Sequence, residues 1–266
     1  MKTEEMAAAL GEVLWTTDLF MPSYQAKELE NWRILDGGQL GHDWGYVSGP
    51  VMLQILPSLL RRIRSPQSKD SAEWEIWMSL TPHEIESQEL GCRYAYGHVV
   101  VMGLGMGWIA ANMALNVNVT KVTVVDLDPE VIDLFDLSGA FDSLPVSAQE
   151  KIEIVNADAT QWKPKVPGSV DFLYADIWLG LAEPEALDQV RQMQKNIQAQ
   201  IVYYWGQEIA IYSASEGELD AKEIERVVQE KIGLPLLVPD DLNYAEMIEK
   251  VIQNRIQRGR VIKVEV

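Results

Sequence analysis

The sequence predicts an α/β protein that is built on a doubly wound, mostly parallel sheet and begins with a mainly helical N-terminal extension. Three observations support this prediction. From residue 98 onward, short β-branched segments alternate with helical ones, a glycine-rich turn follows the first segment, and acidic residues end the next ones. The 266 residues, 47% of them hydrophobic, suffice for one such domain and a smaller appendage. We expect an extension or lid over residues 1–96 and the α/β domain over residues 97–266.

Two helices are expected in the first part of the chain. Residues 4–15 carry a helical pattern of apolar residues. Pro50 and the apolar run after it predict a second helix over residues 50–60, with the proline in its first turn. Gly37 and Gly38 mark a turn between the two helices.

A loop, a strand and a further helix are expected next. Residues 66–71 have the composition of a loop, and residues 73–80 favour a strand. Thr81 is expected to cap the helix that follows, because Pro82 suits a first helical position. Glu84 stands three residues after Thr81, as in a capping box.

The second part of the chain alternates strands with helices. Strands are expected over residues 98–102, 121–125, 151–155, 170–175 and 200–205, and helices over residues 108–115, 129–137 and 184–197. This spacing is typical of βαβ units, whose strands run parallel. The last part is expected to hold amphipathic helices over residues 219–232 and 242–256 and a closing strand over residues 261–266.

The net charge disfavours several classes of partner. The chain has 22 Lys and Arg against 40 Asp and Glu, which gives a formal charge of −18. Proteins that bind nucleic acid or an anionic membrane surface normally present a basic face. We therefore expect a small-molecule substrate, no nucleic acid and no membrane, and the sequence leaves a homodimer open.

Cysteine and histidine offer little chemistry. Cys92 is the sole cysteine, which excludes an intrachain disulfide, and we expect it to be a buried small hydrophobic residue. His42, His83 and His98 share no interval typical of metal ligands, so no metal is expected. Residues 1–10 do not resemble a signal peptide, and a cytoplasmic protein is the simplest expectation.

The glycine turn is the most informative motif. A strand leads directly into Gly103, Gly105 and Gly107, which let the backbone turn tightly and approach a ligand. Asp126 ends the second strand, where an acid suits the two hydroxyl groups of a ribose. A dinucleotide-binding G-x-G-x-x-G pattern would need glycine where Trp108 stands, so NAD is disfavoured.

This part of the chain, over roughly residues 97–206, resembles the class I S-adenosylmethionine-dependent methyltransferase superfamily. The resemblance implies a Rossmann-like methyltransferase fold with S-adenosylmethionine as the cofactor. It also implies a set of cofactor-binding residues, which are Gly103, Leu104, Gly105, Gly107, Asp126, Leu127, Asp158 and Ala159.

The resemblance further implies a role for each acid. Asp126 would hold the ribose hydroxyls, and Asp158 would accept from the adenine amino group. Asp176 ends the fourth strand, where substrate and reactive centre meet in the family, and is the candidate catalytic residue. Asp158 as a plain turn former remains an alternative, and Asp128 is expected to cap the helix that begins at Pro129.

The roles of two tryptophan-containing segments are undecided from the sequence. Trp178 could either wall the pocket beside Asp176 or belong to the core. The segment Trp205, Gly206 and Gln207 at the end of the fifth strand is a second place where pocket residues are expected.

Two short segments also resemble the spermidine-synthase-like branch of the superfamily. Residues 34–39 are like a strand turn of spermidine synthases, and His83 and Glu84 stand where those enzymes carry a Tyr-His-Glu helix. The segment after Asp176 lacks the second acid typical of aminopropyltransferases. It also lacks the Asn/Asp-Pro-Pro-Tyr motif of amino-group methylases, which disfavours methylation of a nucleobase or of glutamine.

Three functions therefore remain open. The leading one is methyl transfer from S-adenosylmethionine to an unidentified small molecule, in which the protein supplies mainly positioning and desolvation. The alternatives are a spermidine-synthase-like aminopropyltransferase and a non-catalytic adenosyl-nucleoside-binding protein. Asp176 is the candidate base if the acceptor must lose a proton.

Overall fold

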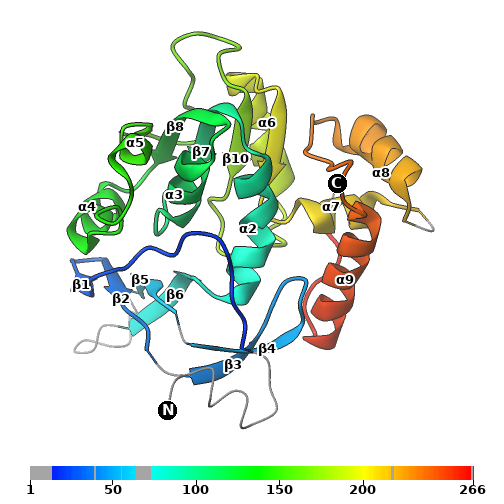
Figure 1. Ribbon diagram of the computed structural model, residues 1–266. Coiled ribbons are helices and arrows are strands. Elements are labelled where there is room, and N and C mark those ends of the chain that lie inside the picture. Colours follow the sequence, from blue (N-terminus) through cyan, green and yellow to red (C-terminus); the bar gives the residue numbers. More distant parts are fainter. Residues whose placement is uncertain (1–13, 39, 55, 64–72, 217–218, 265) are drawn as a thin grey trace.

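The central element is a five-stranded parallel sheet in the order β11-β10-β7-β8-β9 (Figure 1). The computed structural model describes residues 14–38, 40–54, 56–63, 73–216, 219–264 and 266. The strands of this sheet are β7 (Gly97–Met102), β8 (Val119–Asp126), β9 (Ile152–Asn156), β10 (Phe172–Ala175) and β11 (Ile201–Tyr204). This order, with the first strand in the middle and a reversal beside it, confirms the doubly wound α/β prediction.

Helices connect these strands as the alternation predicts. They are α3 (Trp108–Leu115), α4 (Pro129–Ser138), α5 (Val146–Gln149) and α6 (Ala186–Ile197), and α7 (Gln207–Ala214) follows the last strand, β11. The Asp128 side chain accepts a hydrogen bond from the backbone of Glu130, so Asp128 caps α4 as expected. Helices α5 and α7 are absent from the sequence-based prediction.

The segment before the α/β domain consists mainly of strands, so the prediction of a mainly helical extension is wrong. Its strands are β1 (Lys27–Glu28), β2 (Trp32–Leu35), β3 (Leu40–Trp44), β4 (Pro50–Gln54), β5 (Ser58–Ile63) and β6 (Glu73–Ser79). They form an antiparallel sheet β1-β2-β5-β6 and a hairpin β3-β4. The strand expected over residues 73–80 is confirmed.

The helix expected over residues 50–60 is also wrong, because β4 and β5 occupy this segment. A continuous apolar run has no period that separates a buried strand from a helix. Here the partners that decide are distant in the sequence: β4 pairs with β3, and β5 pairs with β2 and β6. The loop expected over residues 66–71 lies outside the described residues. Of the helix expected over residues 4–15, only residues 14 and 15 are described.

Helix α2 (Pro82–Tyr94) links the two parts and begins as predicted. The Thr81 hydroxyl accepts from the backbone of Glu84 at 3.4 Å. The carboxylate of Glu84, however, does not complete a capping box; it accepts from Gln88 in the next turn. Helix α2 thereby carries a buried carboxylate toward the interior.

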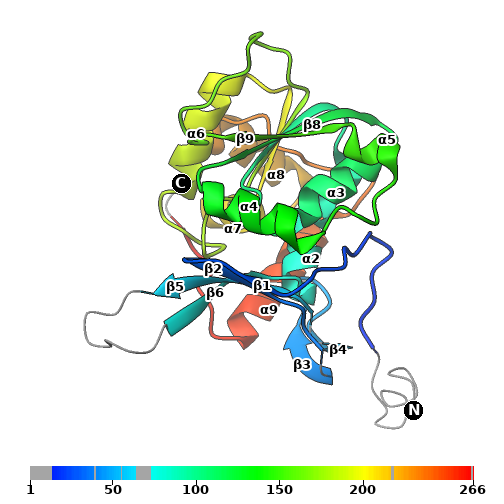
Figure 2. The same cartoon turned by 90° about the vertical axis from the view of Figure 1, so that its left-hand side faces the viewer.

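The four-stranded antiparallel sheet lies next to α4, beneath the α/β part of the molecule (Figures 1 and 2). Two acids at the start of α4 hold it there. Glu130 accepts from the backbone and side-chain nitrogens of Asn31, and Asp128 accepts from the indole nitrogen of Trp32 at 2.8 Å. We call these contacts the α4 clamp. They fix the antiparallel sheet opposite the ends of the parallel strands.

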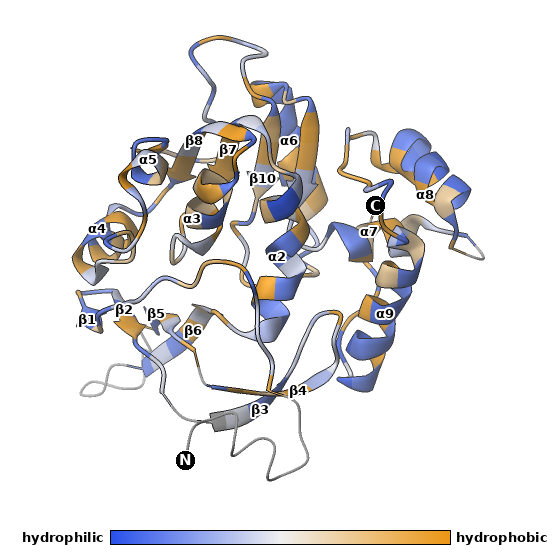
Figure 3. Cartoon of the chain, in the orientation of Figure 1, coloured by the Kyte–Doolittle hydropathy of each residue, from blue (hydrophilic) through white to orange (hydrophobic). Residues whose placement is uncertain are grey.

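The C-terminal part packs beside the central sheet. It contains α8 (Ala221–Val227), the π-helical η1 (Val228–Ile232) and α9 (Tyr244–Gln257), which confirms the two predicted helices. Figure 3 shows both hydrophilic and hydrophobic residues along α8 and α9. The closing strand expected over residues 261–266 is wrong for the described residues, since Val264 donates to a side chain of α7, Ser213, and joins no strand ladder.

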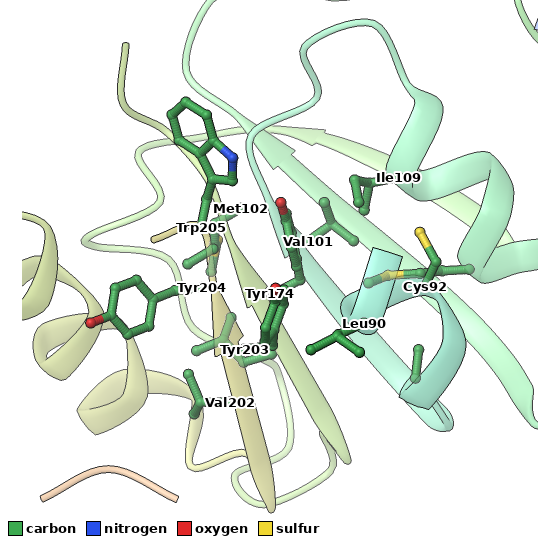
Figure 4. Packing of buried hydrophobic residues seen from close by; sticks show 14 of the residues in the cluster. Leu90, Cys92, Val101, Met102, Ile109, Tyr174, Val202, Tyr203, Tyr204 and Trp205 are labelled. Atoms are coloured by element: carbon green, nitrogen blue, oxygen red, sulfur yellow. The ribbon is translucent and has the colours of Figure 1, made fainter. Parts of the chain in front are cut away.

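The hydrophobic core surrounds the central sheet. Tyr174 and Tyr203, on the adjacent strands β10 and β11, lie next to each other with ring centroids 6.0 Å apart (Figure 4). Leu90 of α2 lies beside them, and Cys92 is buried nearby, as predicted. No described helix is both long and apolar enough to cross a bilayer.

Candidate functional site

The carboxyl ends of the parallel strands meet at one edge of the sheet. In the strand pairing, Met102 at the end of β7 stands opposite Val125 of β8 and Ala175 of β10. Ligands of open α/β sheets bind at this edge, where the strand order reverses. The residues that directly follow these three strand positions are Gly103, Asp126 and Asp176.

Gly103 turns the chain out of β7 with a positive φ of 100°, which side chains other than that of glycine rarely allow. A Cβ atom here would lie 2.1 Å from the backbone oxygen of Asp176. The amide nitrogen of Gly103 donates to the carbonyl oxygen of Val125 at 2.9 Å. Glycine is therefore required for the neighbouring strands to approach each other at this end, and it leaves the backbone of the turn uncovered.

Asp126 is held by backbone amides on both of its oxygens. One oxygen accepts from the amide of Leu104 at 2.8 Å, and the other accepts from the amide of Asp128 at 2.9 Å. Burial raises the pKa of Asp126, and these hydrogen bonds oppose that shift. The carboxylate is thus fixed in orientation beside the glycine turn before any ligand binds.

Asp158 forms a turn, which was the alternative to its predicted role in adenine binding. One carboxylate oxygen accepts from the backbone nitrogen and the hydroxyl of Thr160, at 2.8 and 2.7 Å. The side chain is exposed and also lines the cavity described next, together with Ala159. The turn geometry and a contact with a ligand are compatible at this residue, because a carboxylate oxygen has more than one lone pair.

One cavity of about 310 Å³ joins the predicted site residues. Gly107 is the exception: a Cβ atom there would meet the ring of Phe135 at 2.3 Å, so this glycine serves helix packing. The residues of the predicted site that line the cavity are Gly103, Leu104, Gly105, Asp126, Leu127, Asp158, Ala159 and Asp176.

Three polar side chains that the sequence-based site did not include stand beside Asp176. The amide nitrogen of Gln88 donates to Asp176 at 3.1 Å and to Glu84 at 2.7 Å, and the Tyr174 hydroxyl donates to Asp176 at 3.4 Å. All three line the cavity. The signal for Glu84 and Gln88 was their spacing of four residues on one helix. It went unused because Glu84 was interpreted as a capping residue.

Burial sets the protonation of this acidic pair. It raises the pKa of Asp176 to about 7, against the hydrogen bond from Tyr174, which lowers it. Burial also raises the pKa of Glu84 well above its usual range, with the nearby charge of Asp176 adding to the shift and Gln88 opposing it. Two carboxylates that share one hydrogen-bonding nitrogen cannot both ionise easily, so the pair keeps a proton to higher pH than an isolated carboxyl group would.

Tryptophans form much of the remaining cavity wall. Trp178 donates to Gln189 at 2.6 Å and packs edge-on against Tyr204, so it is both a wall residue and part of the core. Trp205 donates to the hydroxyl of Ser87 at 2.7 Å. Five of the nine tryptophans of the chain line the cavity, namely Trp32, Trp77, Trp108, Trp178 and Trp205.

Acidic residues outnumber basic ones in the cavity lining. Among the described residues that line the cavity, Arg61 is the one basic residue, and its guanidinium donates to Glu75 at 2.9 Å. Against it stand five lining acids, which are Glu84, Asp126, Asp128, Asp158 and Asp176. An anionic ligand would meet repulsion here, whereas a cation would be attracted.

The other candidates lie outside the cavity. Gln207 turns away from it and donates to the carbonyl of Leu237 and to Tyr244, so only Trp205 of the predicted segment contributes. The ring nitrogens of His98 contact Ser169 and Thr123. Among the described residues, no group of three or more His, Cys, Asp or Glu side chains is placed to hold a metal ion.

Sequence comparisons and structural comparisons give different results. No protein-family model matches the sequence, and no curated protein matches it significantly. The methyltransferase domain of the bacterial protein CtHen1-CN matches 46% of this chain and 61% of its own, with 14% identity and a TM-score of 0.34.

Two further matches have ligands in their solved structures. TrmK of M. capricolum, solved with S-adenosyl-homocysteine, covers 44% of this chain and 46% of its own, at 12% identity and a TM-score of 0.33. The glycopeptide N-methyltransferase MtfA, solved with S-adenosyl-L-methionine, covers 42% and 43%, at 15% identity and a TM-score of 0.32. The chain thus spans less than two thirds of each of the three structures, and a functional assignment rests on the residues of the site.

Proposed function

We propose that this chain is an S-adenosylmethionine-dependent methyltransferase that acts on a small molecule. One observation carries the proposal. The open glycine turn, the oriented carboxylate of Asp126, the buried Glu84 and the half-buried Asp176 line the same cavity at the carboxyl ends of the parallel strands. A nucleoside and a reacting group can therefore be held a short distance apart.

The residues present fit an adenosyl ligand. The uncovered turn at Gly103 admits a close backbone approach, Asp126 offers acceptors for ribose hydroxyls, and Asp158 offers one for an amino group. When bound, S-adenosylmethionine supplies an electrophilic methyl group on a sulfonium. The protein then has to orient the acceptor, exclude water and take a proton at the carboxylate of Asp176.

Aminopropyl transfer is the second candidate, and a specific observation favours it. The fourth strand lacks the second acid of the aminopropyltransferase pattern, but α2 places Glu84 beside Asp176. The end of the cavity at Glu84 and Asp176, which we call the reacting end, therefore has two carboxylates although the fourth strand supplies only one of them.

Calorimetric titration tests the cofactor. We expect S-adenosylmethionine and S-adenosylhomocysteine to bind, and NAD to give no heat. Tighter binding of decarboxylated S-adenosylmethionine would instead favour aminopropyl transfer. The proposal fails if no adenosyl compound produces heat or a thermal shift.

Product analysis separates the remaining functions. Incubation of an acceptor library with S-adenosylmethionine should release S-adenosylhomocysteine if a methyl group moves. Incubation with decarboxylated S-adenosylmethionine should release methylthioadenosine if an aminopropyl group moves. Binding of the cofactor without either product, across amines, alcohols, thiols and carboxylates, would indicate a non-catalytic adenosyl-binding protein.

A further inference from the structure

The reacting end of the cavity offers hydrogen-bond acceptors to a ligand. Glu84 and Asp176 are carboxylates, and Gln88 donates its amide nitrogen to both of them. The other end of this amide, Gln88 Oε1, is buried and has no hydrogen-bond partner in the part of the chain that the structure describes. A buried acceptor without a partner costs stability unless a ligand supplies the donor.

Three side-chain donors that line the cavity with Asp176 are already engaged, whereas the indole nitrogen of Trp108, directly after the glycine turn, has no partner among the described residues. The Tyr174 hydroxyl donates to Asp176, the Trp178 indole to Gln189 and the Trp205 indole to Ser87. A ligand group that carries several N–H or O–H hydrogens is therefore matched here, and a group that only accepts is not.

The charge and the aromatic residues of the cavity wall indicate that the ligand group at this end is a cation. In the part of the chain that the structure describes, Arg61 is the one basic side chain that lines the cavity, and it is paired with Glu75. Trp178 and Trp205 line the same cavity as Asp176, and aromatic faces attract cations. A positive ligand would also favour ionisation of both Glu84 and Asp176.

We propose that this end of the cavity binds a primary ammonium group, with Glu84, Gln88 Oε1 and Asp176 as acceptors of its N–H hydrogens. The acceptor substrate is then an organic amine, and Gln88 is a specificity-determining residue. This inference rests on the proposed function, because it names the substrate class of the same site.

The transfer step follows from this placement. The ammonium gives one proton to the carboxylate of Asp176 and becomes a neutral amine with a free electron pair. That pair forms a bond to the transferred carbon while the carbon–sulfur bond breaks, and the electrons of the broken bond remain on sulfur as a neutral thioether. The product nitrogen carries the positive charge that the sulfonium has lost.

Calorimetry with simple probes tests the proposal. Protein saturated with S-adenosylhomocysteine, which has no group to transfer, is titrated with n-butylamine, 1-butanol, butanoate and tetramethylammonium. We expect n-butylamine to bind and 1-butanol and butanoate to bind far more weakly. The variant Gln88→Met should weaken n-butylamine about tenfold. Binding of tetramethylammonium, which has no N–H group, should change less than twofold.

The chain offers a matched control. Gln229 also donates to a glutamate four residues earlier, Glu225, but it is exposed and lies outside the cavity. Gln229→Met should leave n-butylamine binding unchanged, and thermal melting should confirm that both variants fold. Asp176→Asn provides a second test and should weaken n-butylamine at least as much as Gln88→Met.

The outcomes separate this inference from the proposed function. If S-adenosylhomocysteine binds while n-butylamine gives no heat, or while 1-butanol binds equally well, the amine assignment is wrong and the proposed cofactor stands. If S-adenosylhomocysteine gives no heat, the proposed function fails. Titration of the unliganded protein with n-butylamine then still decides whether the ammonium site exists. An equal loss of n-butylamine and tetramethylammonium in Gln88→Met would overturn the role of Gln88.

Discussion

The two ends of the cavity hold the same type of side chain in different surroundings. At the glycine-turn end, Asp126 accepts backbone hydrogen bonds on both oxygens, and Asp158 is part of a turn. At the other end, the hydrogen bonds to Glu84 and Asp176 come from side chains, and burial has shifted both of their pKa values upward. Backbone donors stabilise a fixed negative charge, whereas a buried pair can hold or release a proton near neutral pH. We infer that the first end binds and the second end reacts.

The largest effect is expected at the reacting end. Asp176→Asn should lower turnover by roughly 100- to 1,000-fold, because it removes the group that accepts the proton. Affinity for S-adenosylhomocysteine should stay within about twofold. Turnover is measured by release of the thioether product, and affinity by calorimetry. Equal losses of turnover and cofactor affinity would make Asp176 a binding residue and erase the contrast between the two ends.

A smaller effect on a different quantity is expected at the glycine-turn end. Asp126→Ala should weaken binding of S-adenosylhomocysteine about tenfold or more, since hydrogen bonds to a charged group are lost. Asp126→Asn keeps the shape and should lose less. Unchanged affinity in the alanine variant, with an unchanged melting temperature, would remove Asp126 from the ribose role.

The pH profile sharpens the description of the acidic pair. Asp176 must be ionised to accept a proton, and its pKa is raised to about 7. Turnover should therefore rise with pH through about 7 and level off above it. The charge of Asp176 raises the pKa of Glu84 further, so Glu84 is still protonated when Asp176 ionises. Glu84→Gln keeps a neutral group at this position and should therefore leave the rise near pH 7. A rise that moves to clearly lower pH in the variant would show instead that an ionised Glu84 raises the pKa of Asp176.

The smallest effect is expected at Asp158. Its side chain is exposed and already engaged with Thr160, so solvent screens its contribution. Asp158→Ala should weaken cofactor binding about two- to threefold, with turnover at saturating cofactor unchanged. The comparison variant Asp142→Ala removes an exposed acid outside the cavity and should have no effect on binding. A loss as large as that of Asp126→Ala would place both acids in the same role.

The α/β part was predictable because its signals are local. Strands such as β7 and β8 are short β-branched runs, and the cap at Asp128 is made with a residue two positions along the chain. The glycines that mark the turn after β7 also lie within five consecutive residues. The carboxyl ends of parallel strands meet at one edge of the sheet, so the sequence alone predicts that Asp126 and Asp176 lie close together.

The antiparallel part was not predictable in the same way. The segment after Pro50 becomes two strands because distant strands supply its hydrogen bonds, which an apolar run does not reveal. Glu84 and Gln88 were missed for a related reason. Their role depends on how α2 packs against the end of β10, a contact between residues 88 positions apart.

The α4 clamp has a consequence for the kinetics of ligand exchange. Glu130 and Asp128 fix Asn31 and Trp32, and Trp32 is itself part of the cavity wall. If a ligand passes on this side, the hydrogen bonds of the clamp have to break on entry and form again afterwards, for the entering substrate and for the departing product alike. Their strength then enters the association and dissociation rates equally and cancels in Kd. The time a product stays bound, rather than how tightly it binds at equilibrium, would carry the signature of the clamp.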